Sequence, residues 1–204
     1  MYNINMKFVI FHGAFGSPYG NWFRDLKEKL QALGQDVLTP QFPTDDFSKL
    51  TKTGPINQSL SAWLKTFEKE VLVKIKKGEK LCFIGHSLAP VFILHVVLKY
   101  YLHLDCAIFV SPFMEEIKSE YWQFDLCNKT FYKTDFDFKK LKELIPLSYV
   151  LYSDNDPYVN KKYPLDFAEK MKSKKIVIKN GGHLNKESGF IKFPLVLELC
   201  KSMI

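Results

Sequence analysis

Leu81-Cys82-Phe83-Ile84-Gly85-His86-Ser87-Leu88-Ala89 is the stretch of sequence that decides the fold. Its first four residues form an apolar run that predicts a buried strand, and the apolar residues from Val91 onward predict a helix. Between them stands a serine with a small residue two positions before it and another two positions after it. This arrangement is typical of a nucleophile elbow, a strained turn that holds a serine hydroxyl above the end of a sheet. We therefore interpret Ser87 as a nucleophile rather than as a serine in an ordinary turn.

Five further segments predict buried strands. Each is a short run rich in branched or aromatic residues that ends at a polar residue, a glycine or a proline. Their continuous apolar character is typical of strands that are covered on both faces. The segments are Lys7–Phe11, Asp36–Thr39, Ala107–Val110, Ser148–Tyr152 and Lys175–Ile178.

Helical patterns lie between these strands. The clearest is Gln58 to Lys76, which has one apolar stripe at helical spacing. Strands that alternate with helices predict an α/β fold, with a mostly parallel sheet and helices on both of its faces. The length of 204 residues fits a single domain, 1–204. The other predicted helices are Trp22–Leu33, Val91–Leu102, Pro164–Lys172 and Phe190–Met203.

Residues 111–138 interrupt this alternation. The segment is long, irregular and rich in aromatic side chains, Phe113 and Trp122 among them. Long loops in compact domains often form lids or pocket walls, so these two residues are candidate substrate contacts. The alternative is an excursion that covers the core without touching a ligand, and the sequence leaves both open.

A serine nucleophile needs a base, and His183 is the strongest of the five histidines. It directly follows the last predicted strand, in Asn180-Gly181-Gly182-His183-Leu184. The two glycines give a tight, flexible turn that can bring the imidazole to the edge of the sheet. His86 lies inside the elbow, where we expect its side chain to point away from the working face of Ser87.

The base in turn needs a carboxylate to orient it, and the segment after the fifth strand offers two. Asp156 precedes a proline, which favours an extended backbone and a rigidly aimed side chain. Asp154 can instead bond backbone amides of its own turn. We therefore favour Asp156 as the acid and keep Asp154 as the alternative.

Ser87, Asp156 and His183 occur in the chain order of α/β-hydrolases, and each follows a predicted strand. An oxyanion hole requires two backbone N–H groups. Leu88 supplies one, and Ala14 or Phe15, in the loop after the first strand, supplies the other. His12 precedes this loop and is a third candidate substrate contact.

These residues resemble the YdeN and retinoblastoma-binding protein nine family of small α/β-hydrolases. The resemblance rests on His12-Gly13, on Gly85 to Leu88, on the Asn-Asp-Pro core of 153–159 and on Gly182-His183. It implies a six-stranded sheet of order 2-1-3-4-5-6, a Ser-Asp-His triad and no separate cap domain. Ala89 followed by Pro90 departs from the glycine that the family has at the second small position.

Charge and cysteine content narrow the function classes. The formal net charge is +7, but every basic residue except Arg24 is lysine, and the lysines are spread along the chain. We interpret them as a solvated surface, because specific nucleic-acid recognition favours arginine. The four cysteines have no metal-ligand or redox spacing, so we expect no metal and no cofactor. No signal peptide and no membrane span is evident, which favours the cytoplasm.

The sequence therefore predicts a serine hydrolase that cleaves a small ester, thioester or amide. The first alternative is an interaction protein that keeps the fold with little turnover, since a fold does not fix a function. The second is a nucleic-acid or anionic-surface binder driven by the lysines. The oligomeric state and the substrate itself stay open.

Overall fold

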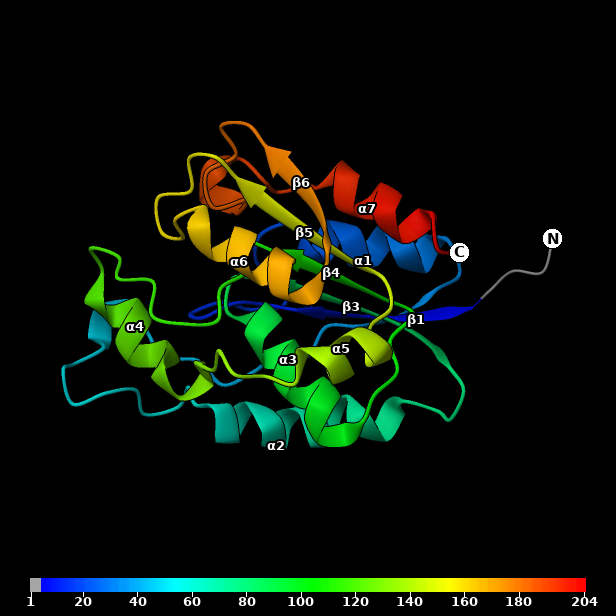
Figure 1. Ribbon diagram of the computed structural model, residues 1–204, viewed down its shortest axis with the longest axis horizontal. Helices are drawn as coiled ribbons and strands as arrows, with labels where there is room; N and C mark the ends of the chain where they lie inside the picture. The colour runs from blue at the N-terminus through cyan, green and yellow to red at the C-terminus, as the bar shows by residue number, and fades with distance from the viewer. Residues whose placement is uncertain (1–4) are drawn as a thin grey trace.

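A six-stranded sheet forms the centre of the protein (Figure 1). The computed structural model describes residues 5–204. All neighbouring strands are parallel and the spatial order is β2-β1-β3-β4-β5-β6, which confirms the predicted fold class and strand order. The strands are β1 (Met6–Phe11), β2 (Asp36–Leu38), β3 (Lys80–His86), β4 (Cys106–Val110), β5 (Ser148–Ser153) and β6 (Lys174–Ile178).

Helices cover both faces of this sheet, as Figure 1 shows. One face packs against α1 (Phe23–Ala32) and α7 (Pro194–Lys201). The other face packs against four helices: α2 (Leu60–Glu70), α3 (Ala89–Tyr100), α5 (Phe138–Leu144) and α6 (Lys162–Met171). The remaining helix is α4 (Trp122–Asn128), and short 3-10 turns occur at Phe47–Lys49, Leu72–Lys74, Lys129–Phe131 and Lys186–Ser188.

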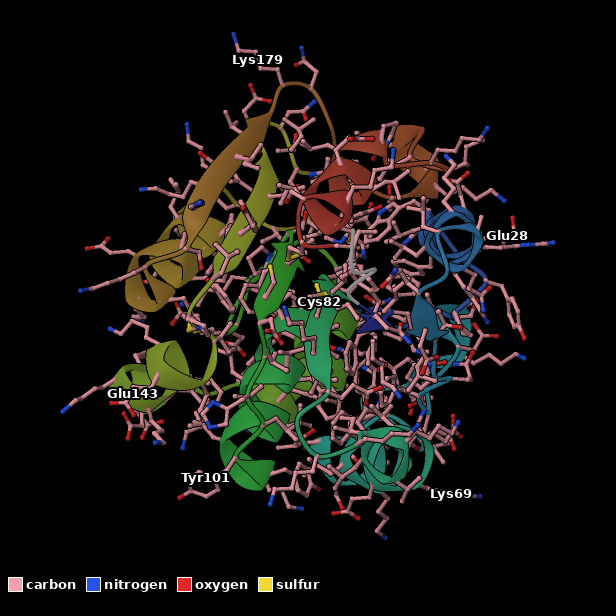
Figure 2. All side chains as sticks on the ribbon, turned by 90° about the vertical axis from the view of Figure 1, so that its right-hand side faces the viewer. Glu28, Lys69, Cys82, Tyr101, Glu143 and Lys179 are labelled. Atoms are coloured by element: carbon pink, nitrogen blue, oxygen red, sulfur yellow. The ribbon has the colours of Figure 1, made fainter. Side chains whose placement is uncertain are left out.

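Alternation along the strands divides the core into two layers. In β1, Val9 and Phe11 belong to the layer under α2 and α3, whereas Phe8 and Ile10 belong to the layer under α1 and α7. This is the period of two that a pleated strand imposes. Figure 2 shows Cys82 of β3 in the interior, while charged side chains such as Lys69 and Lys179 extend from the periphery.

Two elements differ from the prediction. The last strand, β6, is largely exposed rather than buried, because it is an edge strand that pairs only with β5. The helix predicted over Gln58 to Lys76 ends as α2 at Glu70 and continues as a 3-10 turn. In this turn, the buried amine of Lys7 donates a hydrogen bond to the carbonyl of Lys74 at 2.7 Å.

Residues 111–138 lie beside the sheet as α4, a 3-10 turn and connecting loops, and residues 5–204 contain no separate cap. In Figure 1, α4 stands to the left, with the loops that follow the strands. Among the described residues, no helix has both the length and the apolar character that crossing a bilayer requires.

Candidate active site

The turn between β3 and α3 holds Ser87 in a left-handed conformation, with φ 61°. Its amide donates to the Val110 carbonyl at 2.8 Å, which fixes the turn to the end of β4. An added Cβ at Gly85 would lie 2.7 Å from Ile93 Cδ1 and 3.0 Å from the nitrogen of Pro90. Strand and helix therefore pass too closely for any side chain at this position, as a nucleophile elbow requires.

Ser87, His183 and Asp156 come together in one hydrogen-bonded line. His183 Nδ1 lies 2.8 Å from Asp156 Oδ2, and His183 Nε2 lies 3.1 Å from Ser87 Oγ. An ionised carboxylate only accepts, so Nδ1–H donates to Asp156 and Nε2 is left to accept the serine proton. This is the geometry of a nucleophile, a base and a residue that orients the base.

Asp156 is well suited to stay ionised. Burial raises the pKa of its carboxyl, but the hydrogen bond from His183 and the nearby imidazole outweigh burial, so the pKa is lowered overall. Two backbone amides add to this effect, because Tyr158 N and Val159 N donate to Asp156 Oδ1 at 2.9 and 3.0 Å. Both carboxylate oxygens are thus engaged, one by the chain that follows and one by the imidazole.

Asp154 does not reach His183 but holds the loop that carries it. The side chains of residues 153–155 accept hydrogen bonds from three successive backbone amides of that loop, and we call this set of acceptors the acceptor comb. Asp154 thus bonds an amide of the His183 loop, whereas the sequence offered amides of the turn that contains Asp154. The bonds are Asn180 N to Asp154 Oδ1 at 2.8 Å, Gly181 N to Ser153 Oγ at 2.9 Å and Gly182 N to Asn155 Oδ1 at 2.8 Å.

His86 links the elbow to the same loop. Its Nε2–H donates to the His183 carbonyl at 2.9 Å, and the ring packs against Trp22, Phe23 and the His183 ring. Burial, together with the neighbouring His183, lowers the pKa of His86 to about 3, so the ring stays neutral. The side chain lies behind the turn, where it fixes the backbone of His183.

The loop after β1 lies directly over Ser87. An added Cβ at Gly13 would meet Ser87 Cβ at 2.9 Å and the His86 carbonyl at 3.1 Å. The Gly13 carbonyl accepts from His12 Nδ1 at 2.8 Å and from Gly16 N at 3.2 Å. The Phe42 amide donates to His12 Nε2 at 3.0 Å, which places the proton on Nδ1.

A cavity of about 480 Å³ opens in front of Ser87. Five aromatic rings in mutual contact form most of its apolar wall, and polar residues complete the lining. The rings are Phe15, Phe47, Tyr121, Phe124 and Tyr158, and the polar residues outside the Ser-His pair are Asn21, His86, Asn185 and Glu187.

The three predicted substrate contacts do not line this cavity. Phe113 is buried in the core, Trp122 points to solvent with 41% of its surface exposed, and His12 is buried against Phe42 and Trp63. Phe124, two positions after Trp122 on α4, faces the cavity instead. Residues two positions apart on a helix point to different faces. Predicting a helix over these residues would therefore have separated Phe124 from Trp122.

A parallel sheet of this order, with a serine elbow after its third strand, defines the class of α/β-hydrolases. Residues 8–202 match the model of the family described as serine hydrolase. The chain therefore belongs to that family, and the resemblance predicted from the sequence is confirmed.

Individual relatives agree with this assignment. YdeN of Bacillus subtilis (strain 168), a protein named as a hydrolase, is 25% identical over 195 residues, which are 95% of this chain and 93% of YdeN. The crystal structure of YdeN superposes with a TM-score of 0.80 over 97% of this chain and 98% of the other, at 23% identity. Est1E from Butyrivibrio proteoclasticus, in a structure with bound ferulic acid, shares the fold with a TM-score of 0.67, 15% identity and coverage of 98% and 88%.

Replacing Gly85 by alanine is expected to destabilise the protein by about 1–3 kcal/mol, because the new methyl group would overlap Ile93 and the backbone of α3. Chemical denaturation would measure the change in the free energy of unfolding. Gly20→Ala is the matched control, since a Cβ there meets nothing closer than 3.4 Å. Equal stability of the two variants would contradict the close passage at the elbow.

The free energy of unfolding is expected to fall as the pH falls below about 6.5. Burial lowers the pKa of His12 to about 4 and that of His86 to about 3, from an ordinary value of 6.5. Between these values the unfolded chain binds protons that the folded protein excludes. Each histidine therefore costs about 2 kcal/mol of stability at pH 5 relative to pH 7.

Denaturation curves at pH 7 and pH 5 test this dependence. His12→Gln and His86→Gln are each expected to remove about 2 kcal/mol of the difference between the two pH values. The lowered pKa of Asp156 changes the free energy of unfolding mainly below the ordinary aspartate pKa of 3.8, which lies outside the range from pH 5 to pH 7. A wild-type protein equally stable at both pH values would show that the two rings are not held neutral by burial.

Proposed function

We propose that the protein is a serine hydrolase that cleaves a small ester, thioester or amide through an acyl-enzyme. The observation that carries the proposal is the hydrogen-bonded line from Asp156 through His183 to Ser87, which ends in the cavity. Family membership supports hydrolase activity. The line supports the particular mechanism, with Ser87 as nucleophile, His183 as base and Asp156 as acid.

In the first half of the reaction, Ser87 Oγ attacks the substrate carbonyl while His183 Nε2 takes the hydroxyl proton. The tetrahedral intermediate collapses when the imidazolium returns this proton to the leaving group. In the second half, a water molecule attacks the acyl-serine, His183 again takes and returns a proton, and the acid product leaves. Asp156 keeps the proton of His183 on Nδ1 and stabilises the imidazolium in both halves.

The oxyanion is proposed to be held by the amides of Leu88 and Ala14. Within residues 5–204, neither amide donates to a protein acceptor. Leu88 follows the nucleophile directly, at the start of α3. The orientation of the peptide between Gly13 and Ala14 favours Ala14 over Phe15. The Gly13 carbonyl accepts from His12, so the Ala14 N–H of this trans peptide points the opposite way.

An interaction protein with little turnover is the second candidate, favoured only by the partly exposed rings of Tyr121 and Trp122 beside the cavity. No cofactor enters the proposed reaction. The four buried, free cysteines support a reducing compartment such as the cytoplasm.

Ser87→Ala is expected to abolish both ester turnover and labelling by a fluorophosphonate probe, because only an activated serine reacts with the probe. Ser61→Ala, an exposed serine on α2, is the control and should label like the wild type. Asp156→Asn is expected to lower kcat/KM by about 10³- to 10⁴-fold. Asp154→Asn keeps an acceptor oxygen for Asn180 and should retain most of the activity.

Equal labelling of the wild type and Ser87→Ala would remove the enzyme proposal. A stoichiometric partner that binds both forms equally, without any measurable turnover, would favour the interaction protein instead.

Gly13→Ala is expected to lower kcat by about 100-fold, because its methyl group would push the oxyanion loop away from Ser87. Stability is expected to fall as well, by about 1–3 kcal/mol, because Gly13 is buried and the new methyl group meets Ser87 Cβ and the His86 carbonyl; kcat is therefore compared on protein shown to be folded. Steady-state kinetics with an activated ester would measure the loss against Gly20→Ala. Unchanged kcat in Gly13→Ala would mean that this loop does not hold the oxyanion.

A further inference from the structure

The charge of the cavity is opposite in sign to the charge of the whole chain. The sequence carries 29 basic and 22 acidic residues. Among the described residues, the cavity in front of Ser87 is nevertheless lined by one carboxylate, Glu187, and by no lysine or arginine. Lys118 and Lys162 line a neighbouring groove, and Tyr121 and Tyr158 form the wall that both hollows share. The one charged side chain that an anionic substrate would meet among these lining residues is therefore negative.

Glu187 is solvent-exposed where it lines the cavity, and two long hydrogen bonds orient its carboxylate. Its Oε2 accepts from Asn185 Nδ2 at 3.3 Å and lies 3.4 Å from the hydroxyl of Tyr158, which donates to it. Within residues 5–204, Glu187 forms no salt bridge and its Oε1 accepts no hydrogen bond from the protein. One carboxylate oxygen of the cavity thus stays available to a ligand.

The aromatic wall reaches this carboxylate. Tyr158 contacts His183 through its ring, at 5.2 Å between centroids, and Glu187 through its hydroxyl. Phe124 and Tyr121 continue the wall, with centroids 5.3 and 5.9 Å from that of Tyr158. Aromatic rings and a carboxylate both attract a cation, and an alkylammonium group is the substrate group that suits the two together.

From this arrangement we propose that the cavity selects carbonyl substrates that carry an alkylammonium group, with Glu187 and the aromatic wall as the specificity determinants. The inference rests on the proposed hydrolase function and adds the class of substrate to it. The ammonium group pairs with Glu187 and lies against the rings, while the carbonyl carbon reaches Ser87. No step of the proposed reaction changes.

Three benzoate esters of similar size test the preference: benzoylcholine, its neutral carbon isostere 3,3-dimethylbutyl benzoate, and the anionic 3-carboxypropyl benzoate. The expected order of kcat/KM is cation, neutral ester, anion, with the cation favoured over the isostere by about fivefold or more. Glu187→Gln should bring this ratio close to one. Glu143→Gln, an exposed carboxylate at the periphery in Figure 2, should keep the wild-type ratio.

Direct binding separates this inference from the proposed hydrolysis. Benzyltrimethylammonium is expected to bind saturably to the wild type and to Ser87→Ala by calorimetry, and more weakly to Glu187→Gln. If that binding is seen but no ester turns over, the cation site stands and the hydrolase proposal fails. If esters turn over with equal or greater preference for the neutral isostere, and benzyltrimethylammonium does not bind, the cation site is overturned and the hydrolase proposal stands. Absence of both turnover and binding overturns both.

Discussion

The left-handed backbone of Ser87 is the constraint on which the rest of the site depends. A residue with a Cβ reaches this conformation only at a cost, so the surrounding structure has to hold it. Two features do so: the amide bond to Val110 at the end of β4, and the tight passage of Gly85 over the start of α3. Both require β3 in the middle of a parallel sheet, with α3 packed on one face. The fold therefore supplies the strain that aims the hydroxyl into the cavity.

The other two residues of the proposed triad depend on contacts between loops rather than on strain. The acceptor comb of residues 153–155 fixes the backbone of 180–182, and Trp22 Nε1 donates to the Leu184 carbonyl from the opposite side, at 3.0 Å. His86 adds a bond from the elbow. The base is thus positioned by three segments that are far apart in the sequence. The bonds from Gly181 to Ser153, from Trp22 and from His86 are buried, and buried polar bonds orient a side chain more sharply than packing alone.

The apolar runs predicted the strands, and the polar segments that follow three of them predicted the residues of the proposed line, whereas the strand order was implied by the family resemblance. The sequence did not predict the cavity wall. Phe47, Tyr158 and Glu187 come from three separate loops, and no local pattern brings them together. Phe113 was expected at the wall but lies in the core. An aromatic side chain suits either place, so the residue type alone could not distinguish them. The short helix α5 had a usable signal, since Asp137 caps it through the Lys140 amide and Leu141 and Leu144 are buried at helical spacing.

The acceptor comb also limits how this chain can diverge in evolution. Its three bonds join the side chains of residues 153–155 to the backbone amides of 180–182. Residues 153–155 can therefore be exchanged for others that keep an oxygen in place, whereas the donors of 180–182 belong to the backbone. An insertion or deletion in either segment would shift the pairing by one position and carry Asp156 away from His183. A length change between the two segments, where α6 and the exposed edge strand β6 lie, is expected to disturb the three bonds less than a change inside either segment. The length of each segment is therefore under a stronger physical constraint than the identity of the residues that fill it.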